Sequence, residues 1–136
     1  MKSFSEQITL FAQKSQWHAK EVRDGALKKG FGSEGVIGST PVDTSRLESN
    51  WITTLNSPSN QSSLLQDDAQ TALRMMNSVI DSSKLEDTIY MTNNVDYGPN
   101  IEFGGGSPQK APNGMMRINV ARIPRYLKEE SEIVNR

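Results

Sequence analysis

The chain has 136 residues, no cysteine, 35% hydrophobic residues and a formal net charge of −1. This length suits one domain with a modest core, and the lack of cysteine excludes disulfides, thiolate metal sites and cysteine nucleophiles. The amino terminus lacks the apolar centre of a signal peptide, and no apolar run reaches membrane-spanning length. We therefore expect a protein that is made and kept in a cytoplasm and does not bind membranes.

The small net charge hides an uneven distribution. Residues 1–30 and 110–136 each carry six basic and three acidic groups, whereas residues 31–109 carry three basic and ten acidic groups. Segments of opposite charge can complement one another within a subunit or between neighbours, although solvated helix faces and acidic loops give the same pattern. A DNA-binding regulator would show a stronger basic excess.

Residues 1–30 have the spacing of an amphipathic helix. Small or apolar residues recur every three or four positions, at Phe4, Ile8, Phe11, Ser15, Ala19, Val22 and Ala26. Ser3 or Ser5 is expected to cap the start of this helix, and Gly30 to end it. Residues 30–35 match the glycine spacing of a dinucleotide fingerprint, but a helix precedes them where that motif needs a strand. We interpret them as a flexible connector.

A turn motif follows the connector. Pro41 fixes one backbone dihedral, and Asp43 or Thr44 can fold back on backbone donors. Leu47 is expected to anchor the core, and Trp51 to begin a strand over residues 51–55. Asp43 could instead be a catalytic carboxylate, but no base, nucleophile or second acid stands near it in sequence. The turn interpretation is therefore favoured.

The second half of the chain predicts two more helices and a strand. Apolar residues follow helical spacing at Leu65, Ala69, Ala72, Leu73, Met76 and Ile80. Residues 89–92 then alternate as a strand does, and residues 115–134 return to helical spacing. Pro124 should kink the last helix. Between the strand and the last helix, we expect a glycine- and proline-rich loop to protrude. It follows Tyr97, Ile101 and Phe103.

These elements indicate a single α+β domain over residues 1–136. A small sheet is packed by two or three helices, with a long N-terminal helix and a kinked C-terminal helix. Residues 1–30 form a helical arm, residues 40–124 the core, and residues 125–136 the end of the last helix and a tail. Because two strands alone are marginal, we expect further strands from the loops or from neighbouring subunits.

Two separated motifs carry a resemblance to a known family. The chain resembles the minor-tail and neck-protein family of tailed double-stranded-DNA bacteriophages. The first motif is residues 40–51, and the second comprises residues 93–104 and 109–117. The likeness covers residues 40–124. The family has Gly where this chain has Ser45, so the local backbone is expected to differ there.

The resemblance implies a structural virion protein without enzymatic activity, assembled in the host cytoplasm. It would form a homo-oligomeric, sixfold ring in the phage neck, joining the head-closure or connector proteins to the tail. Double-stranded DNA would pass through this ring without sequence-specific binding. A tail-terminator or tail-completion protein, which caps the tail tube, is the alternative within the same class.

We expect the subunit contacts to come from one surface, because aromatic anchors beside a mobile backbone suit such a joint. The candidate contact residues are Tyr97, Ile101, Phe103, Gly104, Gly105, Gly106 and Gln109. The competing interpretation is that Tyr97 and Phe103 close the domain's own core.

The sequence assigns no catalytic, cofactor-binding or metal-binding residue. A metal-dependent phage nuclease would have to use carboxylates such as Asp43, Asp67 and Glu102, which are scattered over a turn, a helix start and the segment before the loop. His18 has no second ligand at metal-binding spacing, so we interpret it as a surface or packing residue.

Overall fold

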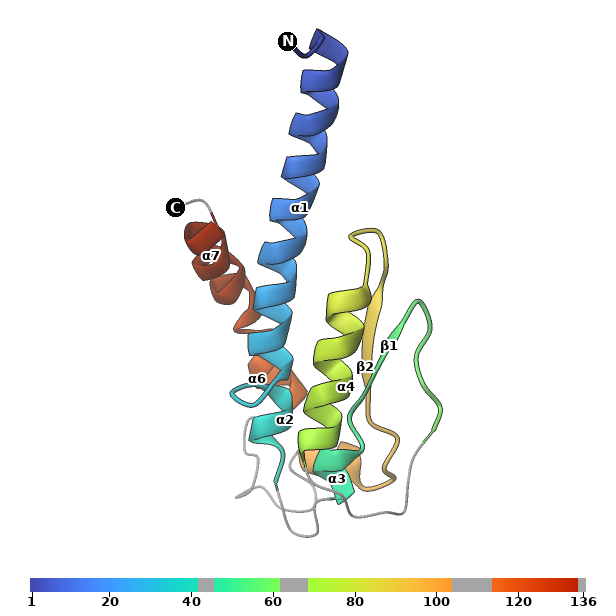
Figure 1. The fold of residues 1–136 in the computed structure, drawn as a ribbon. Coiled ribbons are helices and arrows are strands. Elements are labelled where there is room, and N and C mark those ends of the chain that lie inside the picture. The colour runs from blue at the N-terminus through green and yellow to red at the C-terminus, as the bar shows by residue number, and fades with distance from the viewer. Residues whose placement is uncertain (42–45, 62–68, 104–113, 135–136) are drawn as a thin grey trace.

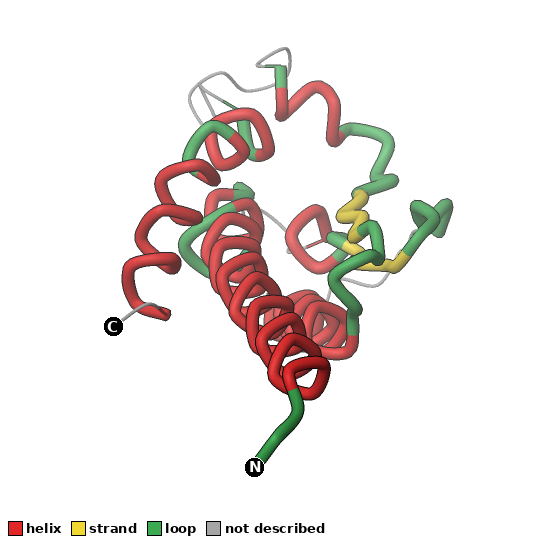
Figure 2. The backbone as a smooth tube through the Cα atoms, turned by 90° about the horizontal axis from the view of Figure 1, so that it is seen from above, coloured by secondary structure: helices red, strands yellow, loops and turns green. Residues whose placement is uncertain are grey.

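A computed structural model describes residues 1–41, 46–61, 69–103 and 114–134, and its α+β architecture confirms the fold class (Figure 1). The long helix α1 (Phe4–Phe31) is flanked by α4 (Ala69–Ser82) on one side and by α7 (Ile123–Val134) on the other (Figure 2). A two-stranded sheet packs against α4. The short helices are α2 (Val36–Ser39), α3 (Arg46–Ser49), α5 (Gly98–Glu102) and α6 (Met116–Val120).

The start of α1 is fixed by the expected serine cap. The hydroxyl of Ser3 accepts a hydrogen bond from the backbone N–H of Glu6 at 3.2 Å, and the Glu6 carboxylate accepts one from the Ser3 N–H at 2.9 Å. This reciprocal pair satisfies two N–H groups that the first turn would otherwise leave unpaired. The helix ends at Phe31, one residue beyond Gly30. The next position needs a glycine, because a Cβ at Gly32 would lie 2.3 Å from the carbonyl oxygen of Lys28.

The interpretation of residues 30–35 as a flexible connector is incomplete. Residues 32–35 form a tight turn that leads directly into α2, and Val36 and Ile37 are fully buried. The turn therefore places two core residues against α1 and α4.

The sheet is antiparallel. Strand β1 (Ile52–Leu55) pairs with β2 (Ile89–Thr92), with Ile52 opposite Thr92 and Leu55 opposite Ile89. Within the described residues the sheet has two strands, so the further strands that we expected are not found there. Its support comes from α4, which packs against β1.

The core lies where α4, the sheet and the short helices meet. Its buried members come from all parts of the chain beyond α1, namely Val36, Ile37, Leu47, Trp51, Ala72, Met76, Ile80, Val95 and Met115. Leu47 and Trp51 are thus core anchors, as predicted. The helix α1 contributes mainly through its second half, where Ala26 is fully buried.

The C-terminal helix is bent by 38°, which confirms the predicted kink. The bend separates α6 from α7 at residues 121–122, and Pro124 stands at the second position of α7. Proline is tolerated in a first turn because its missing N–H would have no partner there. Pro124 therefore lies in the first turn of the second piece of the helix, which begins at Ile123.

Candidate functional site

The side chains of the predicted contact segment divide between the core and the surface. Tyr97 and Ile101 are partly buried and pack against the hydrophobic core, and the Arg46 guanidinium lies 5.9 Å from the centroid of the Tyr97 ring. Phe103 is 70% exposed. Tyr97 therefore helps to close the domain's own core, whereas Phe103 lies on the surface. The remaining candidates, Gly104, Gly105, Gly106 and Gln109, lie outside the described residues.

Glu102 ties the end of α5 to the start of α6. Its Oε1 accepts hydrogen bonds from the backbone N–H groups of Met115 at 2.8 Å and Met116 at 2.7 Å. Its Oε2 accepts hydrogen bonds from the backbone N–H of Arg117 at 3.1 Å and from the Arg117 Nε at 2.9 Å. Burial alone would raise the pKa of Glu102, but the N–H groups of Met116 and Arg117 outweigh it and lower the pKa below its ordinary value. The carboxylate is engaged in holding two helix ends together.

Arg117 links this ion pair to the exposed aromatic ring. Its guanidinium lies 4.9 Å from the centroid of Phe103 and also donates to the backbone carbonyl of Glu102. The pairing of Arg117 with Glu102 confirms that a basic group of the C-terminal segment complements an acidic group of the middle segment. Phe103 is thereby placed beside the junction of α5 and α6.

A shallow groove of about 240 Å³ lies beside Phe103. Its lining is largely apolar and comprises Trp51, Asn93, Gly98, Pro99, Glu102, Phe103, Met115 and Met116. Two of these residues, Trp51 and Met115, belong to the core cluster. The groove is therefore a surface opening onto the core.

The turn motif is anchored by one buried hydrogen-bond chain. The Trp51 Nε1–H donates to the Thr40 hydroxyl at 2.8 Å, and that hydroxyl donates to the Val36 carbonyl at 2.7 Å. Trp51 thus joins the start of β1 to the end of α2. Pro41 follows Thr40 and is partly buried, whereas Asp43 and Thr44 lie outside the described residues.

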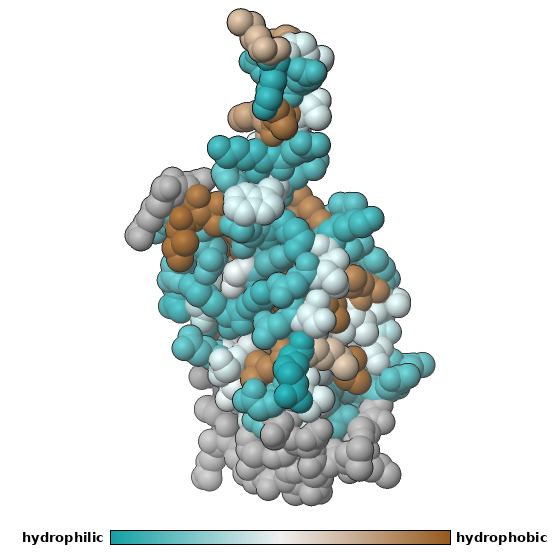
Figure 3. Space-filling model, in the orientation of Figure 1, coloured by the Kyte–Doolittle hydropathy of each residue, from teal (hydrophilic) through white to brown (hydrophobic). Residues whose placement is uncertain are grey.

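The structure leaves exposed three apolar side chains of the stripe that the spacing of residues 1–30 predicted. The first half of α1 extends beyond the rest of the molecule, and every residue from 1 to 17 is exposed (Figure 1). Phe4 is 77% exposed, Ile8 53% and Phe11 73%. Figure 3 shows hydrophobic atoms on this projecting column. The projecting part is shorter than the helical arm predicted over residues 1–30, and from here on the arm means residues 4–19, which span about 24 Å at 1.5 Å per residue.

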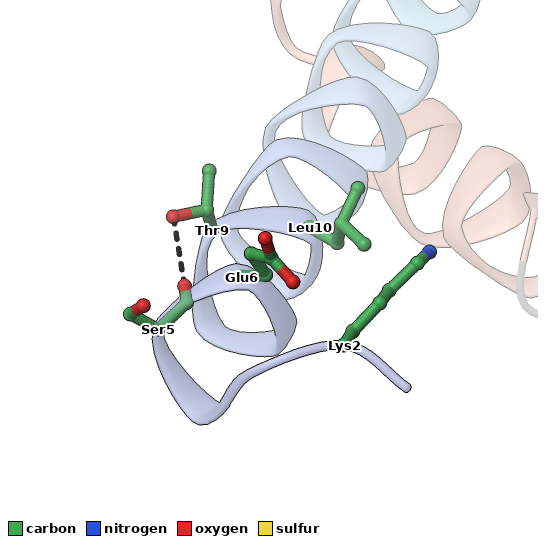
Figure 4. A pocket seen from close by; sticks show the side chains of 5 residues that line it. All are labelled: Lys2, Ser5, Glu6, Thr9 and Leu10. Atoms are coloured by element: carbon green, nitrogen blue, oxygen red, sulfur yellow. Dashed lines mark hydrogen bonds between the residues drawn. The ribbon is translucent and has the colours of Figure 1, made fainter.

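The arm has no cleft of the kind that an active site needs. Figure 4 shows the surface at its tip, where Thr9 donates to the Ser5 carbonyl at 3.0 Å. The other side chains there are those of Lys2, Glu6 and Leu10, all from the first turns of the same helix or the residues before it. Because one helix supplies every wall, this surface is a helix face open to solvent.

The base of the arm is held on both flanks. On the α4 side, the Lys20 ammonium donates to the carbonyls of Ile80 at 3.4 Å and Asp81 at 3.3 Å, and Lys28 pairs with the Asp81 carboxylate at 2.5 Å. On the α7 side, Lys29 pairs with Glu130 at 3.0 Å. The helix therefore leaves the body in a fixed direction.

Arg23 adds a clamp on the loop after α4. Its guanidinium donates to the Lys84 carbonyl at 2.9 Å and to the Ser83 hydroxyl at 2.5 Å. The same guanidinium and the Lys20 ammonium both pair with Asp24, which is 9% exposed. This cluster serves to fasten the loop to α1.

The chain matches no family model, no curated protein and no solved structure. The candidate site therefore rests on its own residues.

Groups able to perform chemistry are scattered in the described ranges. No three His, Asp or Glu side chains gather there in a way that would hold a metal ion. Asp43 and Asp67, the proposed companions of Glu102 in a nuclease site, lie outside those ranges. The His18 ring contacts the Trp17 ring in a tilted arrangement, with ring centroids 5.1 Å apart and an angle of 51° between the ring planes. None of the helices described combines the length and the apolar character that crossing a membrane requires.

Proposed function

We propose that the protein is a structural virion component of a tailed-phage neck. Copies assemble into a ring, sixfold by resemblance, that joins the head-closure complex to the tail around the DNA channel. The proposal takes its family from the resemblance of residues 40–51, 93–104 and 109–117. It takes its mode of action from the exposed apolar surface of the arm.

The arm is the observation that carries the proposal. An isolated helix of about 12 to 15 residues is marginal in water, and packing of its apolar face supplies most of its stability. Phe4, Ile8 and Phe11 form such a face, and all three are more than half exposed. A contiguous exposed apolar surface of this kind marks a protein contact. Assembly with other chains gives the arm the packing that its own domain does not supply.

Phe103 provides a second exposed apolar residue on a different part of the molecule. It stands beside the groove over Trp51 and Met115, near the short helices and away from the arm. A closed ring needs a heterologous interface, in which one patch meets a different patch on the next copy. Two separate surfaces on one subunit satisfy that requirement.

The channel part of the proposal concerns charge. Of the acidic groups in residues 31–109, Asp81 pairs with Lys28 and Glu102 pairs with Arg117, whereas Glu34, Glu86 and Asp96 are exposed. Retention of DNA requires clustered positive charge on the surface that faces it. We propose that exposed carboxylates line the channel, so that DNA slides past them. Retention of double-stranded DNA by the purified protein at ordinary salt would contradict this part.

The test of the proposal is the oligomeric state, measured by native mass spectrometry and electron microscopy with and without head-closure and tail-tube proteins. The wild-type chain should give closed rings, alone or on a partner. Phe11→Glu should abolish them, because it places a charge in the apolar face. Gln16→Glu is the matched control: it adds the same charge to a face of α1 away from Phe11, four residues before Lys20, and should leave the rings intact.

A chain that stays monomeric with every partner would overturn the proposal. Binding to the tail tube rather than to the head-closure complex would instead select the tail-terminator alternative. Cleavage of DNA in the presence of Mg²⁺ or Mn²⁺ would select the nuclease alternative.

A further inference from the structure

The arm continues two contact faces of α1 beyond the body. In the lower half of α1, Lys29 pairs with Glu130 of α7, and Lys28 pairs with Asp81 of α4. At 3.6 residues per turn, a position seven residues away returns to nearly the same face. Counting back from Lys29 in steps of seven gives Val22, Ser15 and Ile8. Phe4 and Phe11 lie four residues before and three residues after Ile8, and therefore on the same face. The apolar side chains of this first face thus continue the side of α1 that contacts α7.

The second face lies on the α4 side, one helical turn before Lys28, since steps of seven from Lys28 itself reach the polar Glu21, Lys14 and Gln7. Four residues before Lys28 is Asp24, and steps of seven from Asp24 reach Trp17 and Leu10. Trp17 is 56% exposed and Leu10 44% exposed. The apolar side chains of this second face therefore continue the side of α1 that contacts α4. The first face loses its partner where the body ends. On the second face, Trp17 still borders a hollow that it shares with Leu85 and Glu86 of the loop after α4, and Leu10 lies beyond that hollow.

The angle between the two faces indicates how they are covered. At about 100° per residue, the mean direction of Phe4, Ile8 and Phe11 lies about 140° from that of Leu10 and Trp17. A two-fold pair of arms would bury one face of each helix and leave the other in water. A helix with two apolar faces at this angle is suited to a neighbour on either side within a closed ring.

The low charge of the arm favours a second copy as the neighbour. One contact between neighbouring arms takes one face from each copy, so the five exposed side chains give it roughly 600 Å² in total, less than the roughly 1,600 Å² of a standard interface. A contact between arms therefore adds to the contacts that the bodies of the subunits make in the ring. Residues 4–19 carry one acidic and one basic group, Glu6 and Lys14. Interface centres are depleted of charge in the same way. With no excess of either sign, the arm needs no oppositely charged partner and can pack against its own kind.

We propose that the Phe4–Ile8–Phe11 face of each arm packs against the Leu10–Trp17 face of the arm of the next copy. Because cyclic symmetry points every arm in the same axial direction, the arms pack in parallel and form a crown on one side of the ring. This inference rests on the proposed ring and adds a contact between arms to the contacts of the bodies, to which the exposed Phe103 belongs.

Cysteine cross-linking tests the arrangement, since the chain has no native cysteine. Ile8→Cys and Leu10→Cys are introduced together and singly, and the oxidised full-length proteins are separated on a denaturing gel. Native mass spectrometry of the same samples reports whether rings are present. The two positions lie on different sides of one helix, so a disulfide within a chain cannot form without breaking that helix.

The double variant should give a ladder of cross-linked dimers, trimers and larger species, whereas each single variant should stay uncross-linked. A double variant of Thr9→Cys and Gln16→Cys, which lie on the face away from both apolar faces, should give no ladder. Dimers of the Ile8→Cys variant alone would reveal a two-fold contact and overturn the inference.

Rings without a ladder would also overturn the crown, and so would cross-links only to a different virion protein in assembled particles; both results would leave the proposed ring standing. Absence of rings under every condition would overturn the ring itself.

Discussion

Replacing Glu102 by glutamine should destabilise the fold by about 2 kcal/mol at neutral pH, because hydrogen bonds to a charged group contribute roughly 1.5 to 3 kcal/mol each and are not additive. The amide oxygen can still accept from Met115 and Met116, which both bond to Oε1. The amide nitrogen, however, replaces Oε2 and faces the two N–H donors of Arg117. Two charge-assisted hydrogen bonds become a contact between donors.

The destabilisation should depend on pH in a defined direction. The pKa of Glu102 is lowered in the folded state, from an ordinary value of 4.5. A lowered pKa means that the carboxylate contributes stability that is fully present above the unfolded value and is lost as pH falls through the folded value. The difference between wild type and Glu102→Gln should therefore be constant near neutrality and shrink as the pH falls below 4.5.

Urea unfolding followed by tryptophan fluorescence measures this difference, since Trp51 is 5% exposed in the folded chain. Glu132→Gln serves as the control because it removes an exposed carboxylate from α7, and it should change the free energy of unfolding by less than about 0.5 kcal/mol. A Glu102→Gln variant as stable as wild type at pH 7 would refute the reasoning. So would a difference that stays constant through the acid range.

Two further changes probe single contacts. Thr40→Val should cost about 2 kcal/mol by urea unfolding, because it leaves the buried Trp51 N–H without its acceptor at 2.8 Å. Combining it with Trp51→Phe should cost less than the sum of the two single changes; strict additivity would contradict the account. Gly114→Ala should lower the melting temperature, since Gly114 has a φ of +81° and a Cβ there would lie 2.2 Å from a Glu102 oxygen. Gly98→Ala is its control, with its nearest contact at 3.8 Å, and equal melting temperatures for the two variants would refute the steric argument.

The elements that sequence predicted well are those specified by local chemistry. Ser3 and Glu6 form their capping box from four consecutive residues, and the strand over residues 89–92 ends where Asn93 begins. Proline was more difficult. Pro124 predicted the kink, but it lies in the first turn of α7, so the bend comes before it. Apolar spacing does not locate the end of a helix to within two residues.

The elements that sequence missed depend on distant contacts. Val36 and Ile37 belong to the four-residue helix α2, which is too short to show a helical period in the sequence. The only sign of their full burial was that two apolar residues stand next to each other between glycines. Apolar spacing also identifies a face without telling what covers it. The same spacing therefore described Ala26, which is buried, and Phe4, which is exposed.

The candidate site was predicted in part for the same reason. Phe103 and Tyr97 share aromatic character and closely similar sequence surroundings, but Tyr97 packs on the core and Phe103 lies at the surface. Sequence named both and could not separate them, because their difference arises from how α5 sits on distant residues. Glu102 was considered only as a metal ligand, whereas its partners at Met115 to Arg117 are more than ten residues away.

The fixed base of the arm has a thermodynamic consequence for any association. A free peptide of this length would have to nucleate a helix and choose an orientation at the moment of binding, and both steps oppose association entropically. Here the helix is already nucleated by the half that is tied through Lys20 and Lys29. The arm is thus preorganised, and a greater share of its contact energy remains as affinity.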